Sequence, residues 1–260
     1  MAGRPECDAG MYARSFFDLQ FQFAEAVSRL SGMPLTRALL EYTNFYIRFG
    51  LGRDFDPDHP RWNEYLAGLH GTTDARGWTY HYYVTRSPEF SPSVVATFGC
   101  FAYARLRDDR IRLHFRNAER DGPSPLSTGR QRHRIAELAA LFAQIERTER
   151  PRVRVIGASW LYNIEAYRRL FPPAYLATAR VIGQRFRHMP LWGQFVDRHG
   201  EVKPHLAAEL LERLGPQSSL DGLDRCFPFQ VLALDAPASV FNDFYGADSR
   251  REREALDVEG

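Results

Sequence analysis

The first third of the chain repeats apolar residues at the spacing of amphipathic helices. Apolar side chains between residues 16 and 30 predict a first helix, and Pro34 suits the first position of a second. Apolar residues of the second helix are spaced by four and three, and Gly50 should end it. They are Leu35, Leu39, Tyr42, Tyr46 and Phe49. Such a stripe is typical of a packed core seam, with the wall of an acyl pocket as the alternative. A third helix is predicted over 61–69.

The middle of the chain changes to the residue pattern of strands. Residues 79–85 and 94–106 predict two strands, the second apolar on both faces like a central strand. Residues 111–116 alternate apolar and polar side chains. If Asp108 and Asp109 form a tight hairpin turn, one sheet face carries four polar residues beside two aromatic ones. These six are Arg105, Arg112, His114 and Arg116, with Phe101 and Tyr103.

Helices and strands interleave over the rest of the chain. A helix is predicted to begin at a capping box formed by Thr128 and Gln131 and to end before Pro151. The elements expected after it are strand 152–157, helix 160–171, strands 176–182 and 191–196, helix 203–214, strand 229–234 and helix 238–245. This order predicts an α+β fold, with α/β as the alternative. We expect helices to flank a mixed, largely antiparallel central sheet, preceded by an aromatic-rich helical N-terminal segment.

One domain is expected to hold most of the chain. We expect residues 11–246 to form it, with a helical part over 11–70 and a mixed core over 79–246, between disordered ends at 1–10 and 247–260. The three cysteines lack paired spacing, which argues against disulfides and a zinc site. The chain start lacks the apolar core of a signal peptide, and the longest apolar run is shorter than the ~20 residues that span a bilayer. These features predict a cytoplasmic protein without a metal or a membrane partner.

Basic residues gather in the middle of the chain. The formal net charge is only +2, yet residues 105–187 hold 18 arginines against 8 acidic residues. Lys203 is the only lysine, a bias that a high-GC genome explains without any functional pressure. The local excess of charge needs another explanation, and it indicates a face that meets something anionic.

The start of the helix after Thr128 carries cations where cations are least stable. Its first turns hold arginines and a histidine, and each cation there costs about 0.3–1 kcal/mol unless it is neutralised. An anion bound by free backbone N–H groups and the arginines would remove this cost. Pairing with Glu119, Asp121 or the acidic C-terminal third is the alternative. The residues expected to bind the anion are Arg112, Arg116, Asn117, Gly129, Arg130, Arg132 and His133, with Ser159 and Asn163 from the next strand-to-helix turn.

His114 and Ser159 are candidates for acid–base or nucleophilic chemistry. His114 shares the polar strand face with two arginines, whose charges favour the neutral imidazole that a general base requires. A histidine hydrogen-bonded on a sheet surface is the alternative. Ser159 follows a strand, but the glycine of a nucleophile elbow is absent after it, so an N-cap is favoured over a nucleophile. Tyr162 and Asn163 are expected to be exposed polar groups.

The order of elements from 79 to 196 resembles the GNAT acyltransferase fold: three strands, a long helix, a strand, a helix and two more strands. The run from Asn163 through Tyr167 to Phe171 is similar to the Asn, Ala, Tyr and Phe positions of that family, whereas its glycine-rich signature is absent from residues 130–134. The resemblance implies coenzyme A or acyl-CoA as cosubstrate, with its pyrophosphate at the helix start near Gly129.

The same resemblance suggests roles for individual residues. Arg130 and Arg132 would hold phosphate, and His114 or Glu119 would act as base. Tyr162 or Tyr167 would protonate the leaving thiolate.

Three functions follow as hypotheses. The first is an acyl-CoA-dependent N-acyltransferase with an anionic small-molecule ligand. The second is a nucleic-acid-binding protein that stacks bases on Phe101 and Tyr103 beside the arginines, although the small net charge counts against it. The third is a non-catalytic interaction module, in which the basic centre pairs with the chain's own acidic residues or with a partner chain.

Overall fold

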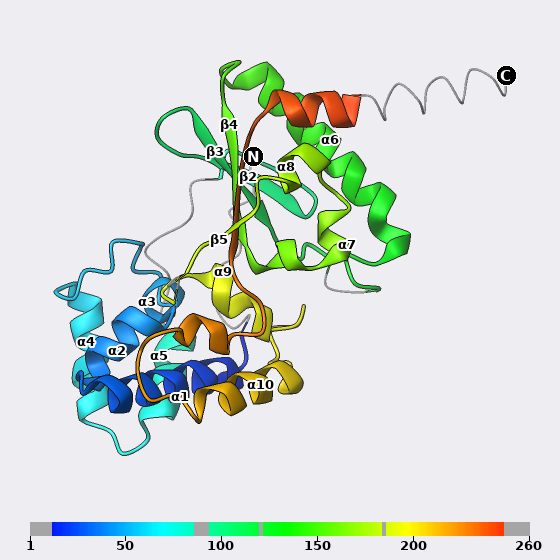
Figure 1. Ribbon diagram of the computed structural model, residues 1–260. Coiled ribbons are helices and arrows are strands. Elements are labelled where there is room, and N and C mark those ends of the chain that lie inside the picture. Colours follow the sequence, from blue (N-terminus) through cyan, green and yellow to red (C-terminus); the bar gives the residue numbers. More distant parts are fainter. Residues whose placement is uncertain (1–11, 86–93, 120–121, 184–185, 247–260) are drawn as a thin grey trace, which may run out of the picture. The chain divides into compact units, whose positions relative to one another are not determined.

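The computed structural model describes residues 12–85, 94–119, 122–183 and 186–246 (Figure 1). The chain divides into two compact units, each made of two separate stretches. Residues 1–91 and 183–230 form the first, called the helical unit, and residues 92–182 and 231–260 form the second, called the sheet unit. We expected the whole of 79–246 to form one core. Instead, residues 183–230 pack with the N-terminal helices.

The helical unit is built around a core of aromatic rings. Its helices are α1 (Arg14–Ser31), α2 (Leu35–Tyr42), α3 (Phe45–Arg48), α4 (Pro60–His70), α5 (Ala75–Thr85), α9 (Met189–Trp192) and α10 (Pro204–Leu214). Phe23 of α1 contacts Trp192 and Phe227 at ring-centre distances of 5.4 and 5.3 Å. These contacts explain why the later stretch belongs to this unit, because burying such rings is strongly stabilising.

The helix predicted from Pro34 to Gly50 is interrupted at Thr43. The Thr43 hydroxyl donates to the Leu39 carbonyl at 2.5 Å and accepts from the Phe45 N–H at 3.3 Å. The Asn44 N–H donates to the buried Gln20 side chain at 2.9 Å. These side chains satisfy the backbone groups that the break leaves unpaired, so α2 and α3 are separate helices. The stripe is packed as a core seam at Leu39, Tyr46 and Phe49, all buried.

Two predicted strands of this unit are helices. Residues 79–85 belong to α5, whose start is capped by the Asp74 carboxylate accepting the Gly77 N–H at 2.8 Å. Thr79, Tyr82 and Tyr83 share the buried face of α5, so tertiary packing outweighs the β propensity of the segment. Residues 191–195 form the end of α9 and the 3₁₀ helix η3 (Gly193–Phe195), and Val196 makes an isolated bridge with Val202.

The sheet unit holds a six-stranded mixed sheet among the residues described. The strands are β1 (Ala96–Phe98), β2 (Phe101–Arg105), β3 (Arg110–Phe115), β4 (Arg154–Ser159), β5 (Arg180–Val181) and β6 (Leu232–Pro237). They lie in the order β1-β2-β3-β4-β6-β5, and every neighbouring pair is antiparallel except β3 and β4. The predicted α+β class, with a largely antiparallel sheet and flanking helices, is therefore confirmed.

Helices of the sheet unit pack on one face of the sheet. They are α6 (Gln131–Thr148), α7 (Glu165–Arg168), α8 (Pro173–Leu176) and a helix over 239–246 (Figure 1). Leu138, Phe142 and Ile145 of α6 join Ile111 and Val155 of the strands in one hydrophobic core. The predicted capping box of α6 does not form, because the 3₁₀ helix η1 (Thr128–Arg130) precedes it and no side chain caps its first N–H groups.

The hairpin register differs by one residue from the prediction. The long strand predicted over 94–106 is divided by a turn at Gly99, which has a φ of 53°. Tyr103 pairs with Leu113 and Ala104 pairs with Arg112, because the loop has three residues instead of two. A one-residue slip turns each side chain to the other face of the sheet. Phe101 and Tyr103 are consequently buried in the core, away from the polar face that holds Arg112 and His114.

Three later elements are shorter or shifted. The helix predicted over 160–171 consists of the 3₁₀ helix η2 (Trp160–Asn163) and the separate α7. The strand predicted over 176–182 is reduced to β5, and the one over 229–234 begins three residues later as β6. Pro172 and Pro173 start α8 and so end any helix that precedes them.

Candidate functional site

β3, α6 and β4 form a β-α-β unit with the two strands parallel. In such units the carboxyl ends of the strands and the start of the helix meet at one edge, where ligands commonly bind. Pairing between β3 and β4 ends at Arg112 and Ile156. Beyond that point, β3 remains paired with β2 up to Phe115, and β4 with β6 up to Ser159. Residues 113–115 and 157–159 thus part from each other, and we call this feature the β3–β4 fork.

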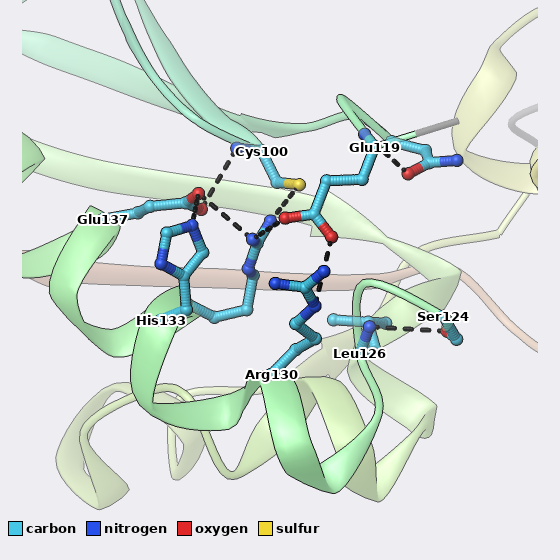
Figure 2. A network of polar contacts seen from close by, with 9 residues as sticks. Cys100, Glu119, Ser124, Leu126, Arg130, His133 and Glu137 are labelled. Atoms are coloured by element: carbon cyan, nitrogen blue, oxygen red, sulfur yellow. Dashed lines mark hydrogen bonds and ion pairs between the residues drawn. The ribbon is translucent and has the colours of Figure 1, made fainter. Parts of the chain in front are cut away.

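A buried arginine, Arg134, lies at the start of α6 and contacts several polar side chains. Figure 2 shows the surrounding cluster, with Cys100, Glu119, Arg130, His133 and Glu137 labelled. Arg134 is 1% exposed, and its Nη2 contacts Glu119 Oε1 at 2.5 Å and Glu137 Oε1 at 3.2 Å. Its Nη1 donates to the Cys100 sulfur. A buried guanidinium requires such partners, because a charge removed from water without compensation is very costly. Arg134 therefore points into the protein.

Neighbouring groups complete this cluster, which we call the Arg134 network: Cys100, Glu119, Arg130, His133, Arg134 and Glu137. Arg130 Nε lies 3.5 Å from Glu119 Oε2, and His133 Nε2 lies 3.2 Å from Glu137 Oε1. The other Glu137 oxygen accepts the Cys100 N–H at 3.1 Å. Two carboxylates thus face two guanidiniums, so internal pairing, the alternative that the sequence left open, neutralises this helix start.

Several atoms of the site are buried without a hydrogen-bond partner in the described structure. They include Glu119 Oε2, Arg134 Nε and Asn117 Nδ2. Each such atom carries a desolvation penalty of about 1–3 kcal/mol. Burial raises the pKa of the Cys100 thiol, against the opposing effects of the Ala118 backbone and Arg134, so the thiol stays protonated at neutral pH. The network is charge-balanced but incompletely hydrogen-bonded.

The remaining residues expected at the helix start lie in different places. Arg132 and Arg116 are exposed. Asn117 Oδ1 accepts the Glu119 N–H at 3.2 Å and so shapes the strand-to-helix loop. Gly129 has open space where a Cβ would stand. The anion-binding set therefore separates into an outward part, with Arg132 and Gly129, and an inward part that already binds carboxylates.

Three residues of this region were missed at the sequence level. Glu137 lies three and four residues after Arg134 and His133, a spacing that places them together on one helix face and could have revealed the contact. Cys100 reaches the network through a tertiary contact. Arg169 donates to the Leu126 carbonyl at 2.9 Å and to Thr128 Oγ1 at 3.4 Å, and so holds the loop before α6.

The tyrosines expected to be proton donors are in the core. Tyr162 is 3% exposed, so the prediction that it is an exposed polar group is wrong, and Tyr167 is equally buried. Tyr162 and Tyr175 share a hydroxyl–hydroxyl hydrogen bond of 2.9 Å beside Gly157 of the fork. Burial raises the pKa values of Tyr162 and Tyr167 well above the ordinary value of 10. His114 lies on the opposite face of the sheet, so the structure does not bring these candidates together.

The turn after β4 has the structure expected if Ser159 is an N-cap and not a nucleophile. Ser159 is the N-cap of η2, and its hydroxyl accepts the Leu161 N–H at 3.1 Å. Asn163 is exposed, and its side-chain amide donates to the Trp160 carbonyl at 2.7 Å. The polar groups at this turn thus make local backbone contacts.

Two hollows in the surface of the sheet unit lie apart from the Arg134 network. One, of about 360 Å³, is lined by charged residues that pair with one another, among them Arg105 with Glu149 and Arg150 with Asp109. The other, of about 230 Å³, combines arginines with apolar side chains: Arg168, Arg169, Phe171, Pro173, Leu176 and Phe244, together with Glu165. Arg130, Arg132 and Arg134 line neither hollow.

Comparisons of the chain with known protein families, curated proteins and solved structures found no match. None of the helices in the described part of the chain is both long and apolar enough to cross a membrane. Within those same residues, no three His, Cys, Asp or Glu side chains are grouped so that they could hold a metal ion. A functional assignment therefore has to be argued from the geometry of the site.

Proposed function

We propose that the protein is an acyl-CoA-dependent N-acyltransferase that binds its cosubstrate at the β3–β4 fork. The observation that carries the proposal is the parting of two parallel strands directly beside the start of a long helix. Parted strands offer backbone N–H and C=O groups that an extended, amide-bearing chain can pair with. The helix start attracts the phosphate end of the same molecule.

The order of elements supports the same proposal. Three strands, the long α6, β4, two short helices and two more strands follow one another in the sheet unit. The resemblance to the GNAT fold was based on strands at 79–85 and 191–196, which are helical. A similar order is kept because β1 (Ala96–Phe98) supplies an additional early strand and β6 (Leu232–Pro237) the last one. The helical stretch 183–230 is inserted between the last two strands.

Phosphate binding is assigned to the outward side of the helix start. Arg132 is exposed there, and Gly129 leaves room for a ligand to approach the backbone. Arg130 completes the set when the ligand competes with Glu119 for its guanidinium, whose Nε lies 3.5 Å from that carboxylate. Arg134 stays paired with Glu119 and Glu137 and does not contact the ligand.

The reaction needs a base for the amine and a proton donor for the thiolate. We assign the base to His114 because Glu119 is already paired with Arg134 at 2.5 Å. The amine nitrogen forms a bond to the acyl carbon as the carbon–sulfur bond breaks. The departing thiolate takes its proton from water, because Tyr162 and Tyr167, the donors expected from the sequence, are buried in the core on the face of the sheet opposite His114.

Ligand-induced stabilisation tests the proposal. Unfolding midpoints would be measured with coenzyme A, acetyl-CoA, nucleotides, sugar phosphates and short oligonucleotides. A ligand present at 100 times its dissociation constant should stabilise the fold by about 2.7 kcal/mol. Acetyl-CoA should then acylate a panel of amines with release of thiol, and His114→Gln should slow that release. A midpoint unchanged by coenzyme A and acetyl-CoA would refute the proposal.

A non-catalytic interaction module is the second candidate, and one observation favours it. Arg130 and Arg134 are already paired with Glu119 and Glu137, and they line neither surface hollow. This candidate predicts that no compound of the panel changes the unfolding midpoint. The stacking platform suggested for nucleic acid is withdrawn, because Phe101 and Tyr103 are buried in the core.

A further inference from the structure

The smaller of the two surface hollows, of about 230 Å³, lies between α7, α8 and the helix over 239–246, and we call it the α7–α8 hollow. Pro172 and Pro173 begin α8 directly after the turn that follows α7. The Tyr245 hydroxyl donates to the Leu170 carbonyl at 2.7 Å, which fastens the helix over 239–246 to the same turn. Three helices of the sheet unit thus frame the hollow.

One side of the α7–α8 hollow is apolar. Phe171 is 2% exposed and belongs to the hydrophobic core of the sheet unit. Leu176 and Phe244 pack against that core but are only partly buried, so both leave apolar surface at the hollow. Removing such surface from water is favourable, so a ligand that fits this side has an apolar body.

The other side of the hollow holds a cation without an acidic partner among the described residues. Arg169 is partly buried, and its guanidinium donates to the Leu126 carbonyl at 2.9 Å and to Thr128 Oγ1 at 3.4 Å. Both acceptors are neutral, and the Nε atom is buried without a hydrogen-bond partner in the described structure. A cation partly removed from water is unfavourable unless an anion compensates its charge. Arg169 therefore indicates that an anion binds here.

A second guanidinium stands at the rim of the hollow. Arg168 lies 3.8 Å from Glu165, and the two side chains are 49% and 80% exposed. An exposed pair of this kind contributes little to stability, so a bound anion can replace Glu165 at small cost. Two arginines and one glutamate leave the hollow with a single net positive charge, which matches a monoanion. A carboxylate suits it, because guanidinium groups bind carboxylates with charge-assisted hydrogen bonds.

We propose that the α7–α8 hollow binds a small monocarboxylic acid with an apolar body. The carboxylate accepts hydrogen bonds from Arg168 and from Nη1 of Arg169, which gives up its 3.4 Å contact with Thr128. The body of the ligand covers the three apolar side chains of the hollow. Because about 230 Å³ is less than the roughly 300–1,000 Å³ of sites for drug-sized ligands, one ring or a short alkyl chain fills it. This inference does not depend on the proposed function, since no residue of the β3–β4 fork lines the hollow.

An NMR titration of the isotopically labelled full chain tests the inference, with hydrocinnamate, a phenyl ring on a short carboxylate chain, as the probe. We expect saturable shifts of the backbone signals of residues 165–176 and of Phe244. The corresponding alcohol keeps the ring without the charge and should bind at least about tenfold more weakly. Acetate lacks the apolar body and should produce no saturable shift at the same concentrations. No saturable shift with hydrocinnamate, or equal affinity for the acid and the alcohol, overturns the inference.

Three variants locate the binding site of the probe. Arg168→Gln removes one guanidinium and should weaken hydrocinnamate binding about threefold to fivefold. Leu176→Glu places a negative charge in the hollow and should weaken binding at least about tenfold. Arg152→Gln, at an exposed position of the same unit outside the hollow, is the control and should leave the affinity unchanged. Circular dichroism verifies that each variant is folded. Folded Arg168→Gln and Leu176→Glu variants that bind hydrocinnamate with the original affinity would contradict its assignment to this hollow.

Discussion

Gly99 and Glu137 are in such close contact that residue 99 has no room for a side chain. A Cβ built on Gly99 would overlap with Glu137 Oε1, and the residue has a φ of 53°, in the left-handed region that favours glycine. The contact places the β1–β2 turn on α6 and lets the Cys100 N–H donate to Glu137 at 3.1 Å. One turn of the sheet is thus matched to one carboxylate of the Arg134 network.

Replacing Gly99 by alanine should destabilise the sheet unit. The added methyl group has to displace a carboxylate that is bound to Arg134, and the backbone stays strained, so we expect a loss of about 2–3 kcal/mol. Gly129→Ala is the matched control, since a Cβ there meets open space and should change stability by less than about 1 kcal/mol. Urea unfolding measures both. Equal effects of the two changes would contradict the contact.

Removing the buried charge of Arg134 should lower the free energy of unfolding more than Gly99→Ala does. Arg134→Met leaves Glu119 and Glu137 facing each other without their shared guanidinium, and we expect a loss of about 3–5 kcal/mol. Arg132→Met removes an exposed cation two residues away and should change stability by no more than about 0.5 kcal/mol. Denaturant titration of both variants measures these changes in the free energy of unfolding. A mild effect of Arg134→Met would mean that the Arg134 network is dispensable for stability.

Glu119 should compete with anionic ligands for Arg130. Under the proposed function, Glu119→Gln should tighten coenzyme A binding about fivefold, which corresponds to ~1 kcal/mol. It should also cost stability, because Arg134 loses one of its two carboxylates. Glu146→Gln, at an exposed position of α6, is the control. Titration calorimetry would measure the affinities. Weaker binding by the folded Glu119→Gln variant would count against the competition.

Alkaline pH should unfold the protein through its buried tyrosines. Burial raises the pKa values of Tyr162, Tyr167 and Tyr175, so the folded state holds these protons more tightly than the unfolded chain. Their contribution to the free energy of unfolding is complete below pH ~10. It is lost as the pH rises further, by up to about 1.4 kcal/mol per pH unit for each group. Tyr162→Phe should flatten this dependence in urea titrations between about pH 9 and 11. An identical slope in the variant would show that Tyr162 does not titrate as argued.

Local sequence patterns predicted α1, α4, α6 and α10, because a long apolar stripe at helical spacing can be buried in only one way. The same kind of reasoning failed for residues 79–85, which have the composition of a strand. Their tyrosines pack on neighbouring helices, and Asp74 caps the first turn. The hairpin was predicted at the right place, but its register depended on a choice between a loop of two residues and one of three. Burial of Phe101 and Tyr103 accompanies the longer loop.

For the candidate site, the sequence by itself determined that cations gather at the start of α6 and that a carboxylate, Glu137, follows at helical spacing. Only the tertiary structure decided what those cations meet. Cys100 comes from the turn between β1 and β2 and Glu119 from the loop after β3, and their approach buries Arg134, whose charge then requires internal carboxylates. Spacing along one helix is local and can be read from the chain. Which distant groups share a buried space depends on how the sheet and α6 pack together, and that is set by the whole sheet unit.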